Sequence, residues 1–216
     1  MGRRALVAGA TGLVGSKLIA ALLADPHCES VHALVRRPLP SENAKLHEHV
    51  VDFAKLEGFV WPAVDDVYCC LGTTIRAAGS QAAFRAVDHD YPLAVARGAL
   101  AVGAQQYLFV SAMGADAHSS VFYSRVKGEL EAAVATLAFH AAIAFRPSLL
   151  AGDRAEHRLG ERLALAVLQP LRGLVPARYR PVADTAVARA MVDFAGRGLA
   201  GFHVVPSDVI QALAPD

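Results

Sequence analysis

The segment from Ala5 to Leu18, ALVAGATGLVGSKL, constrains the fold more than any other part of the chain. An apolar run is followed by glycines at positions 9, 12 and 15 and then by a pattern typical of a helix. In dinucleotide sites, such glycines permit a tight turn, a close approach to a pyrophosphate and close packing of the helix on the strand. The phosphates then lie at the helix N-terminus, where N–H groups and the helix dipole favour negative charge. The segment therefore predicts a nucleotide-binding turn, against the alternative of a turn that is only structural.

Short β-branched segments alternate with longer segments rich in Ala and Leu over most of the 216 residues. This alternation predicts parallel strands joined by helical crossovers, hence a three-layer α/β sheet with helices on both faces. The expected strands are 5–9, 30–35, 48–53, 65–71, 106–112, 141–147 and 201–206, and the expected helices are 13–24, 80–103, 122–137 and 183–195. We therefore expect a single Rossmann-like, doubly wound domain over residues 1–216. Residues 150–182 would form a small substrate-side elaboration towards the C-terminus.

Charge and cysteine content narrow the class of protein. The formal net charge is +1, whereas nucleic-acid binding needs a basic surface, so we expect no nucleic-acid partner. Cys28, Cys69 and Cys70 form no disulfide framework, which favours a reducing compartment and predicts a cytoplasmic location. Lys17 interrupts the one run that resembles a secretory signal, and no segment has about 18 uninterrupted apolar residues, so no membrane span is expected. The nine histidines show no metal-binding pattern, and no metal site is expected.

The residues after the second and third expected strands predict the form of the nucleotide. An NAD site has Asp or Glu after the second strand, to accept hydrogen bonds from the ribose 2′-hydroxyl. Arg36 and Arg37 stand there instead, and guanidinium groups suit a 2′-phosphate, which predicts NADP(H) in preference to NAD(H). The alternative is a pair of solvated arginines. The neighbouring strand ends are expected to supply the adenine rim and the rest of the cofactor cleft through Asp52, Phe53, Leu71, Gly72 and Thr73.

The segment Val121–Val134, VFYSRVKGELEAAV, places Tyr123 and Lys127 on one face of an expected helix, four residues apart. Taken alone, this spacing is typical of a surface tyrosine and a solvated lysine. Ser111, however, ends the fifth expected strand, and C-terminal strand ends of a parallel sheet face the ligand crevice. A nearby ammonium group lowers the pKa of a phenol, so Lys127 is expected to prepare Tyr123 for proton transfer and to bind the nicotinamide ribose.

Together these segments resemble the short-chain dehydrogenases/reductases of the atypical kind, and among them the NADP(H)-binding oxidoreductase branch related to the Tat-interacting protein. The resemblance runs through VVDFAKL, CCLGTT, VDHDY, SAMGADAHSS, FYSRVKGELE and FRPSLLAGDRAEHRLGE, from about residue 5 to residue 165. It implies a Rossmann-like domain that binds NADP(H), with Ser111, Tyr123 and Lys127 as catalytic positions. It also implies cofactor contacts at Gly9, Thr11, Gly12, Leu13, Val14, Gly15, Arg36, Arg37, Lys127, Arg146 and Pro147.

Weaker signals have simpler interpretations. Asp88 and Asp90 are expected to be solvated at the start of an alanine-rich helix, and Ser119 and Ser120 to cap the helix that follows them. Cys69 and Cys70 are expected to be small buried strand residues. The excess of arginine over acidic residues in 153–180 fits either a solvated helix with ion pairs or contacts to an anionic or acyl-bearing substrate or a protein partner.

Two functions are compatible with these features. The first is an oxidoreductase that transfers hydride between NADP(H) and a carbonyl or alcohol carbon. In it Tyr123 would donate or accept the proton, Ser111 would polarise the carbonyl oxygen and Lys127 would tune Tyr123. The second is an NADPH-binding regulatory or assembly protein with weak or no turnover. The complete Ser–Tyr–Lys set favours the enzyme, because a sensor has no need of it.

Overall fold

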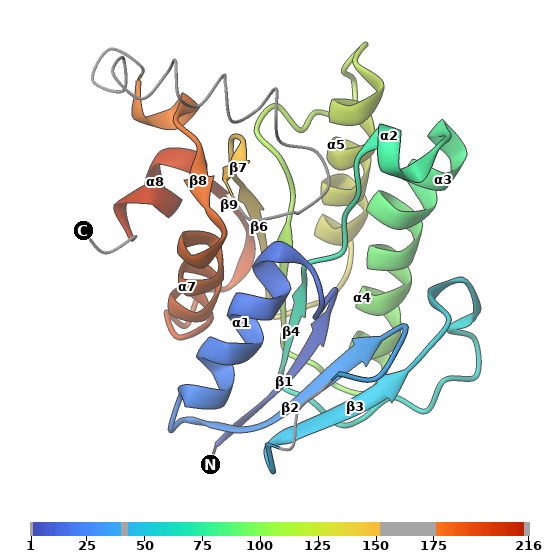
Figure 1. The fold of residues 1–216 in the computed structure, drawn as a ribbon, viewed down its shortest axis with the longest axis vertical. Helices are drawn as coiled ribbons and strands as arrows, with labels where there is room; N and C mark the ends of the chain where they lie inside the picture. Colours follow the sequence, from blue (N-terminus) through green and yellow to red (C-terminus); the bar gives the residue numbers. More distant parts are fainter. Residues whose placement is uncertain (1, 40–42, 152–175, 214–216) are drawn as a thin grey trace.

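Seven strands form one parallel sheet in the computed structural model, which describes residues 2–39, 43–151 and 176–213 (Figure 1). The sheet order is β3-β2-β1-β4-β5-β6-β9, and every pair of neighbours runs parallel. The strands are β1 (Arg3–Ala8), β2 (Cys28–Val35), β3 (Leu46–Val50), β4 (Asp66–Cys69), β5 (Gln106–Val110), β6 (Ala141–Arg146) and β9 (Gly201–Pro206). The doubly wound, Rossmann-like sheet predicted from the alternating segments is confirmed.

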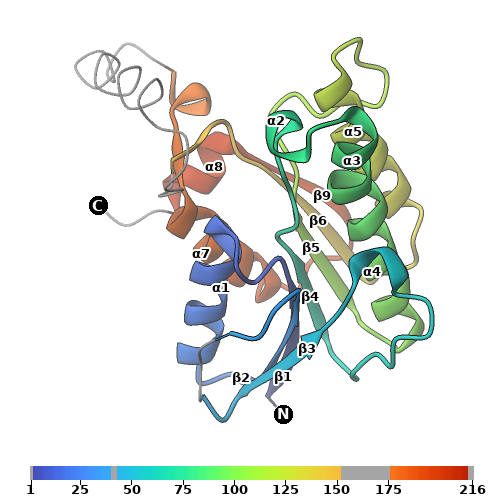
Figure 2. The same cartoon turned by 45° about the vertical axis from the view of Figure 1, so that its right-hand side comes forward.

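Helices cover both faces of the sheet (Figure 2). On one face α1 (Leu13–Ala24) packs against α7 (Asp184–Ala195), and on the other lie α4 (Tyr91–Ala101) and α5 (Phe122–Ala135). β6 is buried at every position but its last, as expected for a strand covered on both sides. The two cores are built around Val7, Val31 and Met191 on the α1 side and around Leu6, Tyr107 and Leu130 on the α5 side.

A second, two-stranded sheet forms from the chain beyond β6, apart from α7 and β9, which belong to the main layers. β7 (Leu150–Ala151) pairs with β8 (Val182–Ala183), and the 3-10 turn η3 (Ala177–Tyr179) precedes β8. The last helix, α8 (Ser207–Ala212), contacts η3 and β8. Most of the predicted substrate-side segment, residues 152–175, lies outside the described residues, so its role stays a prediction. In the described part of the chain, no helix is long and apolar enough to cross a membrane.

The helix predicted over residues 80–103 is not a single regular helix. α2 (Ile75–Ala78) precedes it, and Ser80 then caps α3 (Gln81–Arg85) by accepting a hydrogen bond from the Ala83 N–H, at 3.1 Å. A π-helical turn follows and leads into α4. The prediction was right about helical backbone here but missed α2 and the irregular turn.

The π-helical turn η2 (Ala86–Asp90) has a physical cause in Pro92. The Tyr91 N–H donates to the Ala86 carbonyl, five residues back, instead of four. Pro92 has no N–H, and its ring would clash with the carbonyl four residues earlier in a regular helix. The wider turn removes that conflict and rotates Asp88 inward; π turns of this kind are frequent at functional sites.

The third strand is shorter than predicted, and the crossover after it is a loop. β3 ends at Val50, because the Asp52 side chain accepts a hydrogen bond from the Ala54 N–H (3.0 Å) and starts the 3-10 turn η1 (Phe53–Lys55). In the described chain no α-helix lies between β3 and β4, so side chains must cover that part of the sheet.

A stack of rings lies on that part of the sheet. The His32 ring stacks on those of His47 and His49, with centroids 5.0 and 5.3 Å away, and its Nδ1 lies 3.0 Å from His49 Nε2. Phe59 meets His49 edge-on, and Trp61 meets Phe59 in the same way. Burial lowers the pKa of His32 to about 4, and repulsion from His49, His47 and Arg4 adds to this effect.

We expect this stack to make the protein less stable in acid. The folded state holds His32 neutral down to a pH of about 4, whereas the unfolded chain takes up the proton near pH 6.5, so stability falls as pH drops through that window. His32→Phe keeps a stacked ring and removes the titration. The fall in melting temperature between pH 6.5 and 4 should be smaller in this variant than in the parent, and unchanged in an exposed control, His140→Gln. Equal slopes in the parent and His32→Phe would contradict the assignment.

Candidate functional site

The glycine turn after β1 has the backbone that its sequence predicts. Gly9 has a φ of +84°, and a Cβ there would lie 2.6 Å from the Cys70 carbonyl group. A Cβ on Gly15 would lie 2.1 Å from the Gly9 oxygen, so α1 packs directly on the turn. Gly12 is the N-cap of α1 and offers no side chain to the first N–H groups of the helix. These N–H groups therefore remain available to an anion, as a bound pyrophosphate requires.

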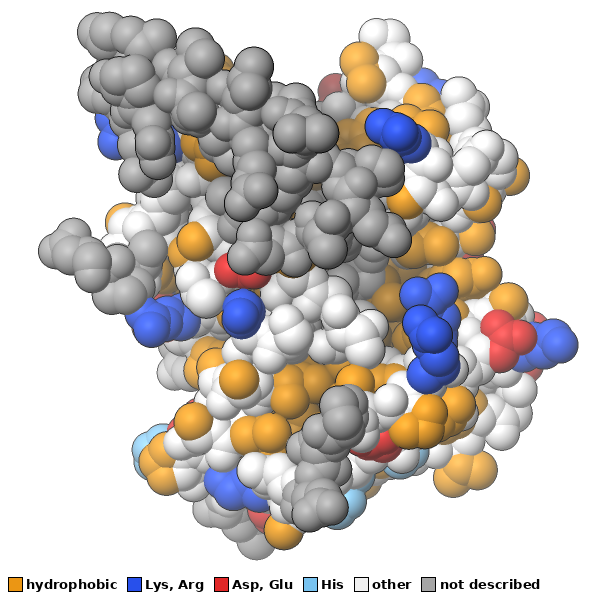
Figure 3. Space-filling model, viewed as in Figure 1, with side chains coloured by type: hydrophobic (Ala, Val, Ile, Leu, Met, Phe, Trp, Pro, Cys, Tyr) orange, Lys and Arg blue, Asp and Glu red, His pale blue; other side chains and the backbone are white. Residues whose placement is uncertain are grey.

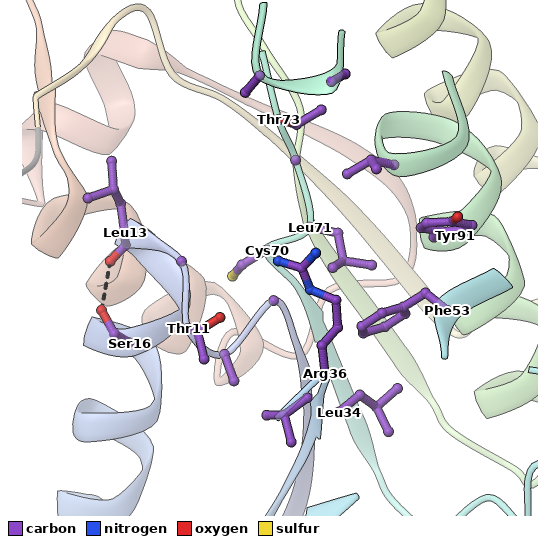
Figure 4. A pocket seen from close by; sticks show the side chains of 18 of the residues that line it. Thr11, Leu13, Ser16, Leu34, Arg36, Phe53, Cys70, Leu71, Thr73 and Tyr91 are labelled. Carbon is purple, nitrogen blue, oxygen red and sulfur yellow. Dashed lines mark hydrogen bonds between the residues drawn. The ribbon is translucent and has the colours of Figure 1, made fainter. Parts of the chain in front are cut away.

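A cleft of about 810 Å³ opens at this turn, between the end of β1 and the end of β4. The sheet order reverses there, which is where open α/β sheets bind ligands, and the volume is within the range of small-molecule sites. Ten of the residues predicted to contact the cofactor line it (Figure 4), namely Gly9, Thr11, Gly12, Leu13, Arg36, Asp52, Phe53, Leu71, Gly72 and Thr73.

The walls of the cleft differ in character. Arg36 extends from the end of β2 into it (Figure 4), and Lys17 of α1 also lines it. Arg36 and Arg37 are both exposed, but Arg37 is not among the lining residues. Phe53 and Tyr91 stack on the far side, with centroids 6.1 Å apart. Figure 3 shows Lys and Arg side chains next to apolar ones over the end of β2. The residues thus fit a nucleotide with a flat base and several negative charges.

Some predicted cofactor residues lie outside the lining of this cleft: Val14, Gly15, Arg37, Lys127, Arg146 and Pro147. Val14 is buried in the core and Gly15 lies beneath the turn, so these two shape the backbone. Sequence reasoning missed several residues that do line the cleft, chiefly Ser16, Lys17, Cys70, Tyr91 and Asp184. Lys17 could have been found, because it follows the glycine turn on the first helix.

Lys127 is buried beside the cleft. Its Nζ forms an ion pair with Asp88 Oδ1 at 2.8 Å, and the two residues are only 3% and 1% exposed. It also donates to the Val110 carbonyl at 3.5 Å and lies 3.9 Å from where a Cβ on Gly72 would be. The second oxygen of Asp88 accepts a hydrogen bond from the Thr73 N–H at 2.8 Å. Asp88 thus ties α5 to the loop after β4, which forms part of the cleft.

The prediction that Asp88 is solvated was wrong. The π turn directs its side chain inward, and a buried carboxylate there needs the compensating charge that Lys127 supplies. Asp90, two residues later, is exposed as predicted and accepts a hydrogen bond from His89, at 2.7 Å. Periodicity could not separate the two, because a π turn changes the angle between successive side chains.

Ser111 is buried, and its hydroxyl donates to Glu131 of α5. The same carboxylate accepts two hydrogen bonds from Arg146 at the end of β6, one of them from Nε at 2.9 Å. The structure therefore brings Ser111 to α5, but at Glu131, two turns after Tyr123, and Ser111 does not line the cleft. Its single hydroxyl proton is already donated to Glu131.

Tyr123 lies in the first turn of α5 and packs on Phe84, with ring centroids 5.5 Å apart. Burial raises the pKa of Tyr123 above its usual value of 10; Lys127 acts in the opposite direction, and Asp88 raises it further. As expected, Lys127 by itself lowers the pKa of Tyr123. The expectation of a lowered pKa was nevertheless wrong, because burial and Asp88 together raise it by more. The charge of Lys127 is offset by Asp88, a partner that the sequence did not reveal.

Tyr123, Lys127 and Glu131 share one face of α5 at intervals of four residues. The same spacing could have identified Glu131 from the sequence as the third side chain of this face, but it was not predicted.

Of the two predicted capping serines, Ser119 accepts a hydrogen bond from the Val121 N–H (3.1 Å), but α5 itself begins at Phe122 with no side-chain cap. In the described residues, no group of three or more His, Cys, Asp or Glu side chains is arranged to hold a metal ion.

The family of the chain follows from comparison with known proteins. The model of the NAD dependent epimerase/dehydratase family matches residues 5–169. Protein HTATIP2 of Rattus norvegicus is 35% identical over 216 residues, which is 97% of this chain and 88% of the relative. Protein FMP52 of Coccidioides immitis, described as mitochondrial, is 35% identical over 169 residues, 72% of this chain and 69% of the relative.

Solved structures share the fold. An oxidoreductase of the short-chain dehydrogenase/reductase family from Burkholderia thailandensis has a TM-score of 0.73 at 22% identity, covering 97% of this chain and 93% of its own. MoeE5 in complex with UDP-glucose and NAD has a TM-score of 0.70 at 17% identity, covering 93% and 74%. The family model, which matches three quarters of the chain, and the HTATIP2 similarity show that the chain belongs to the NAD dependent epimerase/dehydratase family.

Proposed function

We propose that the protein is an NADP(H)-dependent oxidoreductase that transfers hydride between the nicotinamide and a carbonyl or alcohol carbon. The observation that supports this function best is the buried Lys127 beside Gly72, on the same face of α5 as Tyr123. A charged lysine in such a place is costly unless it has a task at the cleft or a structural partner. The proximity of a phenol one turn away favours proton transfer.

The cofactor would be held by groups of several elements. The turn at Gly9 and Gly12 and the N-terminus of α1 would bind the pyrophosphate, and Phe53 and Tyr91 would border the adenine. Arg36, with Lys17, would bind the 2′-phosphate. When bound, NADPH supplies the hydride, and the chain supplies orientation and the proton.

Tyr123 is the proposed proton donor in the direction of carbonyl reduction. Its O–H would protonate the carbonyl oxygen as the carbonyl carbon receives hydride, which yields an alcohol. Ser111 could polarise the same oxygen only after its hydroxyl leaves Glu131, because a hydroxyl has a single proton to donate. Lys127 would bind the ribose and stabilise the phenolate that remains.

The experiment that tests this function is a screen of carbonyl substrates with NADPH on the purified full-length protein. Consumption of NADPH that depends on both the carbonyl compound and Tyr123 is the expected result. NADPH binding without turnover across chemically diverse carbonyls would instead support the second candidate, a cofactor-binding regulatory protein. The specific observation that favours this alternative is that Ser111 is engaged by Glu131.

Two further features stay proposals, the ligand of residues 153–180 and the cellular location. The arginine excess of 153–180 suggests an anionic substrate or a protein partner, but most of that segment lies outside the described residues. The cysteine content favours a cytoplasmic location. The three free cysteines of the chain lie in or next to β2 and β4, and only Cys70 lines the cleft.

Arg36→Ala is expected to reduce the preference for NADPH over NADH by roughly ten- to a hundredfold, because one charged hydrogen bond contributes roughly 1.5–3 kcal/mol. Arg37→Ala is the matched control, since Arg37 is the neighbouring exposed arginine that does not line the cleft. Calorimetric titration of each variant with both cofactors measures the preference. An equal loss in both variants would place the 2′-phosphate between the two arginines, and equal affinity of the parent for both cofactors would remove the basis for NADP(H).

A further inference from the structure

The ion pair between Asp88 and Lys127 has consequences for the direction of the reaction. Lys127 Nζ lies 2.8 Å from Asp88 Oδ1, and both side chains are almost completely buried. A lysine whose only task was to promote ionisation of Tyr123 would act best without an anion next to it. Burial already raises the pKa of Tyr123, and the carboxylate opposes the effect by which Lys127 would lower it.

Asp88 is held firmly in this place. Its second oxygen accepts the hydrogen bond of the Thr73 N–H at 2.8 Å, and the π turn before Pro92 fixes its backbone. The aspartate therefore cannot swing away from Lys127 without breaking a contact to the loop that lines the cleft. It is a built part of the site and not a solvated neighbour.

The other described charged groups nearby are engaged with partners of their own. On α5, Glu129 pairs with Arg85 of α3 on the outer side of the helix. Towards β5 and β6, Glu131 takes the hydrogen bonds of Arg146 and Ser111. Arg125 of α5 donates to the Ser119 carbonyl at 2.9 Å and lies 4.0 Å from Glu129. Further groups are the His89–Asp90 pair of η2 and the Cys69 thiol of β4, whose pKa is raised by burial. Asp88 and Lys127 are thus the charges that face Tyr123 most directly.

We propose that Asp88 is a positioning residue that neutralises Lys127 and keeps Tyr123 a protonated phenol, so that the site operates as a carbonyl reductase near neutral pH. This inference rests on the function proposed above. In reduction the Tyr123 O–H bond would break and its proton would go to the carbonyl oxygen, while bound NADPH would supply the hydride to the carbonyl carbon. After release of the alcohol and the oxidised cofactor, the Tyr123 phenolate would take up a proton from solvent. The reverse reaction needs phenolate at the start, which Asp88 disfavours.

Ultraviolet titration of tyrosinate tests the inference without any substrate. The chain has five tyrosines, and subtraction of the Tyr123→Phe titration from each measurement isolates Tyr123. In Asp88→Asn the titration midpoint of Tyr123 should move to lower pH, and its ionised fraction at a fixed pH below the midpoint should rise about tenfold. Asp88→Glu, which keeps the charge, should restore the parent midpoint. Glu129→Gln removes an acid from the outer side of the same helix and should leave the midpoint unchanged.

A second variant covers the case in which Asp88→Asn does not fold. Asp88→Asn/Lys127→Met removes both charges, so its Tyr123 midpoint should stay near that of the parent, whereas Lys127→Met alone should move the midpoint to higher pH. An unchanged midpoint in Asp88→Asn, or a double variant that titrates like Lys127→Met alone, would overturn the proposed role of Asp88. The tyrosinate titration needs no turnover, so it can be interpreted even if the carbonyl screen finds no substrate. Failure of the proposed role of Asp88 is therefore distinguishable from failure of the proposed oxidoreductase function.

Discussion

Tyr123→Phe is expected to lower turnover by about 10²–10⁴-fold, the usual contribution of a positioned acid or base, while NADPH affinity and stability stay near those of the parent. Phenylalanine preserves the ring that packs on Phe84 and removes only the hydroxyl. The rate effect is large because the carbonyl oxygen then has no phenol to protonate it, and Ser111 is engaged by Glu131. Turnover with a substrate from the carbonyl screen, NADPH titration and thermal unfolding together measure the three quantities.

Tyr107→Phe is the matched control for this experiment. It removes the same atom from a buried tyrosine whose hydroxyl donates to the Pro92 carbonyl at 2.8 Å, and Tyr107 lies in the core on β5. Stability should fall by about 1 kcal/mol with little change in rate. If Tyr123→Phe turned over at the parent rate with normal NADPH binding, Tyr123 would not be the proton donor.

Gly15→Ala is expected to lower stability by about 1–3 kcal/mol and NADPH affinity by roughly ten- to a hundredfold. Its new Cβ would lie 2.1 Å from the Gly9 oxygen, which is backbone and cannot rotate away, so α1 must move off the turn. The N–H groups at the start of α1 would then no longer point towards the bound phosphates. Chemical denaturation and calorimetric titration measure the two effects.

Gly196→Ala separates this clash from the general effect of adding a methyl group. Gly196 has an ordinary negative φ of −81° at the end of α7, and the nearest atom to a Cβ there is 3.5 Å away. This variant should keep parental stability within about 0.5 kcal/mol and parental NADPH affinity. A Gly15→Ala protein indistinguishable from Gly196→Ala in both measurements would show that close packing at Gly15 is not needed.

Much of the fold was readable from local pattern. The alternation of apolar strands and helices, with glycines at 9, 12 and 15, predicted a parallel sheet and a tight glycine turn after the first strand, and the structure has both. The reason is that residues close together in the chain set both features. Apolar side chains mark a buried strand, and a turn that requires a positive φ requires glycine. Arg36 in the cleft followed from the same logic, because its place after β2 is a property of sequence position.

Other features depended on contacts between distant residues. The loop crossover after β3 is stabilised by rings from separate strands and a loop, including His32, His49 and Phe59. No local sequence pattern predicts that these rings come into contact. Likewise, Ser111 donates to Glu131 because Arg146, a residue of a different strand, holds that carboxylate in place.

The sequence alone therefore determined the sheet, the glycine turn and the face of α5 that carries Tyr123 and Lys127. The tertiary structure decided the electrostatics of that face. Asp88 reaches Lys127 only because Pro92 forces a π turn and the long crossover between β4 and β5 brings η2 against α5. A charge acts through distance and burial, which are fixed by packing and not by spacing along the chain, so the ionisation of Tyr123 could be judged only in three dimensions.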